Sequence, residues 1–142
     1  MKLIILLAIL ACCSVYMCRE PDNLRELKNR YSTFLDKIRS ENTDPRFNVL
    51  KKRILVSGFR GGRPEVGYNI NKGDEIGICV NGTPNQMFHV LIHELAHATV
   101  PEYDHSKQFW TNFNDLKEKC MQWGIYQGID SETKFCGKYI RD

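Results

Sequence analysis

The sequence has little net charge, no paired cysteine motif, no internal repeat and no low-complexity tract. Its 20 lysines and arginines face 17 acidic residues, which leaves a net charge of +3. Proteins that bind nucleic acid usually carry a concentrated basic surface, so nucleic acid is not an expected partner. None of the cysteines lies in a CxxC pair, so a cysteine-ligated zinc site is not indicated. The pair Gly61–Gly62 indicates a turn and does not resemble a phosphate-binding loop.

One long apolar run lies at the N-terminus, where Lys2 precedes an apolar stretch that extends from Leu3 to Cys18. A positive start followed by an apolar core is typical of a secretory signal. The run is short for a membrane span, which needs about 20 residues, although a retained anchor also fits. We therefore predict a hydrophobic signal peptide or membrane anchor over residues 1–18 and a single domain over residues 19–142. Through residues 3–18 the protein would be exported or held at a membrane.

Six cysteines are present, and three of them, Cys12, Cys13 and Cys18, lie in or beside the apolar run. The remainder of the chain carries Cys79, Cys120 and Cys136. In an exported domain one disulfide can form among these three, and we expect it between Cys120 and Cys136. Free buried thiols are the alternative.

The spacing of apolar residues predicts an α+β fold. A helical repeat of leucine and aromatic residues predicts a helix from Asp22 to about Ser40. A short strand is indicated over residues 54–59. Two alternating segments, 66–70 and 76–80, are joined by a turn at residues 71–74 and predict a β-hairpin with one apolar face. A further amphipathic helix is expected to begin near Ser106 and to close at Gly124.

A central helix is predicted directly after this hairpin. Thr83 and Gln86 have the spacing of a capping box, in which each side chain bonds to the other residue's main-chain N–H. Pro84 suits the first helical position, because its missing N–H would be unpaired there anyway. Pro101 is expected to end the helix by about Val100.

This helix contains the sequence His93-Glu94-Leu95-Ala96-His97, an HExxH motif. Residues four apart project from the same helical face, so both imidazoles can bind one Zn²⁺. Glu94 is rotated off that line, so it can act as catalytic base on a water that attacks a carbonyl. The motif therefore predicts a zinc-dependent peptidase with Glu94 as its catalytic residue and a peptide or protein as its substrate.

A catalytic zinc takes three protein ligands and keeps one position open, so a third ligand is required. We favour His105, because imidazole suits zinc and residues 101–104 are long enough to turn the chain back over the site. Asp104 is an alternative ligand, or a partner that orients a ligand imidazole. Glu118 is the main competitor, because a His₂Glu site often takes its glutamate from a following helix.

Other polar residues near the motif have less defined roles. His89 lies one turn before His93 and is expected to support the ligands or to lie at the surface. The oxyanion that forms during peptide hydrolysis needs a stabilising donor. Tyr103, Tyr126 and Tyr139 are candidates for this donor, and each of them can equally be a packing aromatic.

Several stretches resemble the WLM and SprT-like group of metallopeptidases: Val90 to His97, Asp104 to Ser106, and Phe109-Trp110 with Phe113. The similarity is greatest to the small versions in large DNA viruses, which have segments like Gly124 to Tyr126 and Phe135 to Gly137. The resemblance implies a zincin-like fold: a small, mainly antiparallel sheet, an HExxH active-site helix and flanking helices. It also implies zinc ligands at His93, His97 and His105, with Glu94 catalytic.

Two other functions stay open. One is a non-catalytic, zinc-stabilised binding or structural protein of a membrane or virion. The other is a WLM/SprT-like protease that acts on DNA-bound proteins. The sequence favours neither a particular substrate nor a particular oligomeric state.

Overall fold

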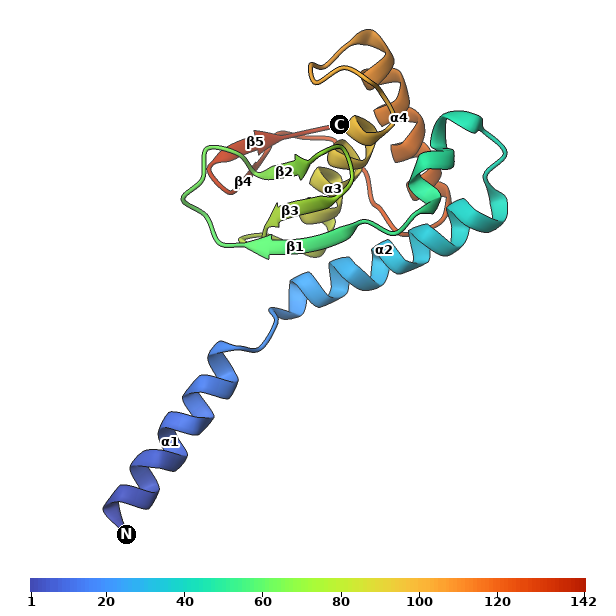
Figure 1. Ribbon diagram of the computed structural model, residues 1–142. Helices are drawn as coiled ribbons and strands as arrows, with labels where there is room; N and C mark the ends of the chain where they lie inside the picture. Colours follow the sequence, from blue (N-terminus) through green and yellow to red (C-terminus); the bar gives the residue numbers. More distant parts are fainter.

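The computed structural model describes all 142 residues and has the predicted α+β architecture (Figure 1). The elements follow in the order α1 (Lys2–Met17), α2 (Asp22–Glu41), the 3₁₀ helix η1 (Pro45–Lys51), β1 (Leu55–Phe59), β2 (Gly67–Ile70), β3 (Glu75–Cys79), α3 (Pro84–Ala98), α4 (Lys107–Gln122), β4 (Thr133–Phe135) and β5 (Lys138–Ile140). A single core cluster of 29 buried residues joins α2, the sheet, α3, α4 and the C-terminal strands.

The N-terminal apolar run forms α1, which extends away from the rest of the molecule and buries none of its residues (Figure 1). The helical run that begins at Lys2 contains a stretch long and apolar enough to cross a membrane, and a signal sequence near the N-terminus satisfies the same criterion. The length and the apolar composition of α1 therefore agree with the predicted signal peptide or membrane anchor. In contrast, α2 packs against the core through the six apolar residues that its periodicity indicated: Leu24, Leu27, Tyr31, Phe34, Leu35 and Ile38.

The main sheet has three strands in the order β1-β3-β2. The predicted hairpin is confirmed, because β2 and β3 pair antiparallel with Tyr68 opposite Gly77. β1 pairs parallel to β3, with Ser57 opposite Gly77, so β3 occupies the centre. This central place fits its burial, since Ile76, Gly77, Ile78 and Cys79 are all buried. β2 therefore lies at the edge of the sheet, beside α3.

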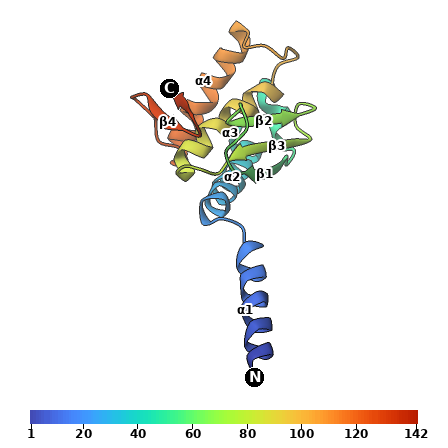
Figure 2. The same cartoon turned by 90° about the vertical axis from the view of Figure 1, so that its left-hand side faces the viewer.

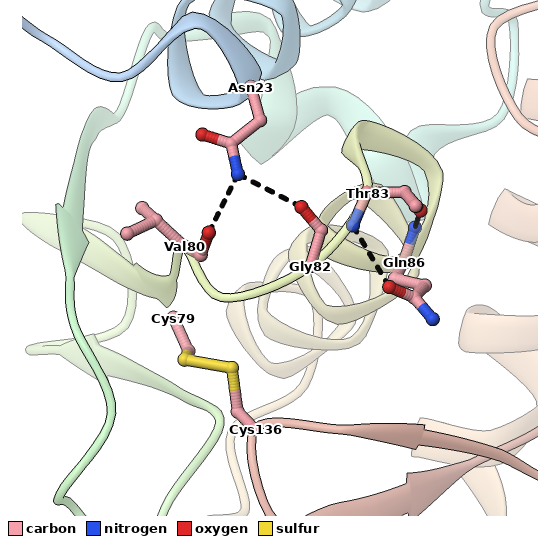
Figure 3. The surroundings of a disulfide bond; sticks show 7 residues. All are labelled: Asn23, Cys79, Val80, Gly82, Thr83, Gln86 and Cys136. Carbon is pink, nitrogen blue, oxygen red and sulfur yellow. Dashed lines mark hydrogen bonds between the residues drawn. A yellow bond between two sulfur atoms is a disulfide. The ribbon is translucent and has the colours of Figure 1, made fainter.

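The central helix α3 begins and ends close to the predicted positions. Thr83 accepts a hydrogen bond from the Gln86 N–H, and the Gln86 side chain accepts one from the Thr83 N–H, so the capping box is confirmed (Figure 3). Asn23 at the start of α2 donates to the main-chain oxygens of Val80 and Gly82. These bonds fix the connection between β3 and α3, and so the direction in which α3 crosses the sheet.

The disulfide prediction is wrong: Cys79 pairs with Cys136, and Cys120 is a buried free thiol (Figure 3). Cys120 lies on the inward face of α4, where it is fully buried in the core. Cys136 lies at the tip of the antiparallel β4–β5 hairpin, which the sequence did not reveal. Cys136 and Gly137 form its turn with positive φ angles of 47° and 81°, as a tight two-residue hairpin requires. The disulfide thus joins the hairpin tip to the end of β3.

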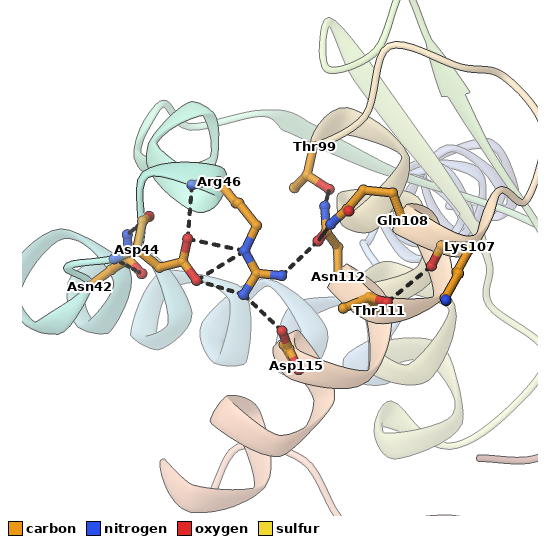
Figure 4. A network of polar contacts seen from close by, with 9 residues as sticks. All are labelled: Asn42, Asp44, Arg46, Thr99, Lys107, Gln108, Thr111, Asn112 and Asp115. Atoms are coloured by element: carbon orange, nitrogen blue, oxygen red, sulfur yellow. Dashed lines mark hydrogen bonds and ion pairs between the residues drawn. The ribbon is translucent and has the colours of Figure 1, made fainter.

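A polar network holds α4 against η1 and the end of α3 (Figure 4). The Arg46 guanidinium bonds to the carboxylates of Asp44 and Asp115 and donates to the Asn112 side-chain oxygen at 2.9 Å. The Asn112 amide in turn donates to the Thr99 hydroxyl at 2.8 Å. Asn112 is buried, and a buried amide keeps its position only where its hydrogen bonds are satisfied. The network therefore fixes the point at which the chain leaves α3.

Candidate metal centre

Three histidine side chains converge at the C-terminal half of α3. The His105 Nε2 atom lies 3.0 Å from the Nε2 atom of His93 and 3.2 Å from that of His97. One nitrogen from each ring lies within 4.8 Å of the others. Ligand atoms arranged tetrahedrally around Zn²⁺ at about 2.0–2.1 Å are about 3.3–3.4 Å apart. The three rings therefore have close to the separation that one shared metal ion requires.

The chain reaches this arrangement because α3 ends one residue after its last histidine. His97 is followed by Ala98 and by Thr99, the C-cap of α3. The connection then returns to Ser106, whose hydroxyl accepts from the Phe109 N–H and caps α4. His105 directly precedes this cap, so its main chain is held beside a rigid helix end.

Phe109 forms the support beneath the cluster. Its ring is fully buried and its centroid lies 4.9 Å from that of His93, 4.4 Å from His97 and 4.7 Å from His105. Trp110 flanks the cluster, with its ring 5.4 Å from His105. Packing against these aromatic rings limits the rotation of the imidazoles, so the three ring nitrogens are held close together.

Lys72, in the turn between β2 and β3, holds the loop that carries His105. Its ammonium group donates to the main-chain oxygens of Val100, at 2.7 Å, and Glu102. It also lies 4.5 Å from the centroid of the Tyr103 ring. A cation is favourable beside the carbonyls at a helix C-terminus. The sequence predicted only a turn here, since no local signal relates Lys72 to a loop about 30 residues later.

His93 and His97 have the protonation state that metal ligands need. Burial, together with the nearby imidazoles, lowers the pKa of His93 to about 3. Burial and the neighbouring His105 and Lys72 lower the pKa of His97 to about 4. Both rings are therefore neutral at pH 7, with a lone pair available for a cation.

Glu94 is buried and forms no ion pair. Burial raises the pKa of its carboxyl group to about 7. A carboxylate in such surroundings is stabilised by a nearby cation. Glu94 and the three histidines line one cleft of about 510 Å³, so a metal ion on the histidines would supply that cation.

The cleft has an extended segment on each side. Residues 65–68, which include the start of β2, line one wall, and residues 138–141 around β5 line the other. Gly67 approaches α3 closely: a Cβ atom built on it would lie 2.5 Å from Val90 Cγ1 and 3.2 Å from Glu94 Oε1. Glycine therefore keeps the space beside the Glu94 carboxylate open. The wall around β5 was missed from the sequence because its strands have only three residues each.

His89 belongs to a separate buried cluster and not to the cluster of His93, His97 and His105. Its Nδ1 atom lies 3.1 Å from the Tyr126 hydroxyl and 3.0 Å from Asp142 Oδ1. Burial lowers the pKa of His89 and raises that of Tyr126. The Ile129 N–H and Lys117 complete the surroundings of Asp142. The cluster anchors the chain after β5 to α3 and α4, and the expectation of a surface position for His89 is wrong.

The positions of the alternative metal ligands and of the candidate tyrosines separate those that line the cleft from those that do not. Neither Asp104 nor Glu118 joins the histidine cluster, and both are exposed. Of the three tyrosines, Tyr126 is buried beside His89, and Tyr103 is 82% exposed. Tyr139 lines the cleft and is largely exposed.

Comparison with known proteins gives one distant relative. No family model matches the chain, and no solved structure matches it. An uncharacterized protein of Acanthamoeba polyphaga mimivirus is 30% identical over 129 residues, which cover 84% of this chain and 62% of the viral protein. The chain thus spans less than two thirds of the length of this relative, and it is similar to a viral protein of undescribed activity.

Proposed function

We propose that the protein is a zinc-dependent peptidase with a zincin-like active site. One observation carries the proposal: the ring nitrogens of His93, His97 and His105 meet in a cleft that also contains the carboxyl group of Glu94. An imidazole triad with an open fourth position is the ligand set of a catalytic zinc. A helix that carries the HExxH motif beside a small mixed sheet supports the proposal.

The residues divide the chemistry between them. His93, His97 and His105 would hold the ion, which when bound supplies a Lewis acid that activates water and polarises a carbonyl. Glu94 would accept the proton of the attacking water and later deliver it to the leaving amine. Tyr139, which lines the same cleft, would donate a hydrogen bond to the developing oxyanion.

The edge strand β2 supports a peptide as the substrate. The Cys79 N–H donates to the Val66 oxygen at 2.9 Å. Because the bonding direction alternates along an antiparallel pair, the N–H and C=O of Gly67 point away from β3. These free groups can pair with an extended peptide main chain, as other edge strands do.

The apolar helix α1 supports a place in the secretory pathway or at a membrane.

Metal analysis of the purified full chain tests the proposal. We expect one zinc per chain and cleavage of unstructured peptides that stops with a chelator and returns with zinc. His93→Ala and His105→Ala should lose the zinc. Loss of a residue that only orients a ligand weakens metal binding by up to about 100-fold, and loss of a ligand itself should weaken it more.

Glu118→Ala and Asp104→Ala serve as matched controls and should retain the zinc. Retention in His105→Ala with loss in Glu118→Ala would contradict the ligand assignment. A chain that binds zinc but cleaves no member of a broad peptide library would indicate the non-catalytic, zinc-stabilised module instead.

Replacement of Lys72 by methionine should weaken zinc binding about tenfold, within the range for residues that orient ligands. The variant keeps the apolar stem but loses the hydrogen bonds to Val100 and Glu102, so the loop that carries His105 becomes looser. Competition with a coloured chelator measures the affinity. Lys52→Met removes the same charge from an exposed position and should leave the affinity unchanged. Equal affinities for the two variants would contradict a positioning role for Lys72.

A further inference from the structure

The two walls of the cleft lie on opposite sides of α3 and differ in charge. Figure 2 places the β4–β5 hairpin on one side of α3 and the three-stranded sheet on the other. No residue of β3 or β4 lines the cleft, so β2 and β5 both border it with their unpaired edges. The histidine cluster lies between them. A bound peptide would therefore meet the hairpin as well as β2.

The hairpin wall carries two cations and no carboxylate. Lys138 and Arg141 line the cleft, are exposed, and take part in no ion pair. The opposite wall has Glu65, whose side chain is also without an ion-pair partner. Long basic side chains can extend across apolar surface while their charges stay in water. The charges of Lys138 and Arg141 are thus free to meet a ligand.

The segment that carries Lys138 and Arg141 is anchored to the rest of the fold. The disulfide between Cys136 and Cys79 holds the hairpin tip, and Phe135 and Ile140 anchor the strands in the core. Asp142, next to Arg141, accepts hydrogen bonds from the Tyr126 hydroxyl and the Ile129 N–H, both at 2.7 Å. Charges held at defined places discriminate between ligands better than charges on a mobile segment do.

The cleft also offers aromatic surface from α4 and from the hairpin. Trp110 of α4 is 45% exposed and lies 5.4 Å from the His105 ring, and Tyr139 of the hairpin is 69% exposed; both line the cleft. Exposed aromatic rings are favoured contact surfaces in binding sites because they bury a large area with few rotatable bonds. The cleft therefore combines an aromatic surface near the histidines with positive charge along the hairpin.

We propose that this cleft prefers extended peptides with acidic side chains around an aromatic residue, and that Lys138 and Arg141 select them. This inference rests on the proposed function, because it concerns the substrate of the same cleft. Acidic side chains gain ion pairs with the hairpin wall, whereas basic side chains meet like charge there. Opposite charge at an interface favours one partner mainly by excluding the other.

Two labelled peptides test this preference. Both have a central phenylalanine. One has glutamate and the other has lysine at alternate positions, so that in an extended peptide all the charged side chains, which have the same sign, lie on one face. Fluorescence anisotropy measures their binding to the full-length Glu94→Gln chain incubated with zinc sulfate, so no turnover is needed. We expect the glutamate peptide to bind about tenfold more tightly at low salt, since two partly exposed ion pairs contribute a few-fold each. The difference should shrink in high salt.

Charge reversal identifies the residues responsible. In Lys138→Glu/Arg141→Glu the preference should reverse towards the lysine peptide. Single Lys138→Glu should reduce the preference several-fold, whereas Lys134→Glu, on β4 of the same hairpin and outside the cleft, should leave it unchanged. Far-ultraviolet circular dichroism and the thermal midpoint check that each variant is folded.

The outcomes separate this inference from the proposed activity. Selective binding that depends on Lys138 and Arg141, in a chain that cleaves nothing, would support the inference and reject the peptidase. Cleavage without charge preference, or a preference that survives charge reversal, would overturn the inference and leave the peptidase standing. Absence of binding by both peptides would overturn the inference as well.

Discussion

Replacement of Glu94 by glutamine should reduce kcat for peptide cleavage by about 10²–10⁴-fold, the usual contribution of a general base. Glutamine has nearly the same shape, but its amide cannot accept a proton from water at neutral pH. The carboxyl group is buried in the cleft and forms no ion pair, so the change disrupts no salt bridge. Single-turnover cleavage of a quenched fluorescent peptide measures the rate.

Zinc content and stability separate catalysis from structure in this variant. Because Glu94 lies outside the imidazole triad, Glu94→Gln should retain one zinc per chain and a similar thermal midpoint. Glu118→Gln makes the same chemical change at an exposed position of α4 and should cleave at the parental rate. If Glu94→Gln kept the parental rate, the assignment of Glu94 as the base would be wrong.

Removal of the disulfide by Cys79→Ala/Cys136→Ala should lower the free energy of unfolding by about 4 kcal/mol. The bridge closes a loop between residues 57 positions apart, and a loop of that length contributes about this much by restricting the unfolded chain. Urea unfolding in the absence of reductant measures the change. In the presence of reductant the parent should unfold at nearly the same urea concentration as the variant.

Cys120→Ala is the matched control for this double replacement. Cys120 is fully buried and unpaired, so its replacement leaves only a small cavity and should cost about 1–2 kcal/mol. Peptide mapping without reductant should recover a fragment that joins Cys79 to Cys136. A fragment that joined Cys120 to Cys136 instead, or a larger loss in Cys120→Ala than in the double variant, would contradict the observed pairing.

The parts of the molecule that were predicted correctly depend on interactions between residues close in sequence. The capping box of α3 needs only Thr83 and Gln86, three residues apart. The β2–β3 hairpin follows from two alternating segments and a turn of four residues. The meeting of His93 and His97 follows from one turn of helix. His105 lies beside them because a short loop and the Ser106 helix cap leave the returning chain few other positions, and its role as a metal ligand stays a prediction.

The parts that were missed depend on residues far apart in the chain. Cys120 is nearer to Cys136 in sequence than Cys79 is, but only Cys79 lies at the end of the strand that meets the hairpin tip. The parallel pairing of β1 with β3 follows from the central position of β3, which no local pattern specifies. Lys72 contacts the loop before His105 only because the β2–β3 turn lies against the end of α3.

The separation of α1 from the remainder of the molecule means that this segment can vary without a change in the core. None of its residues is buried, and its side-chain hydrogen bonds stay within the helix itself. Loss, shortening or exchange of this segment would therefore leave the cleft and its histidines undisturbed. If α1 is the proposed signal or anchor, the segment that sets the location and the cleft can change independently, so a membrane-bound form and a released form would have the same cleft.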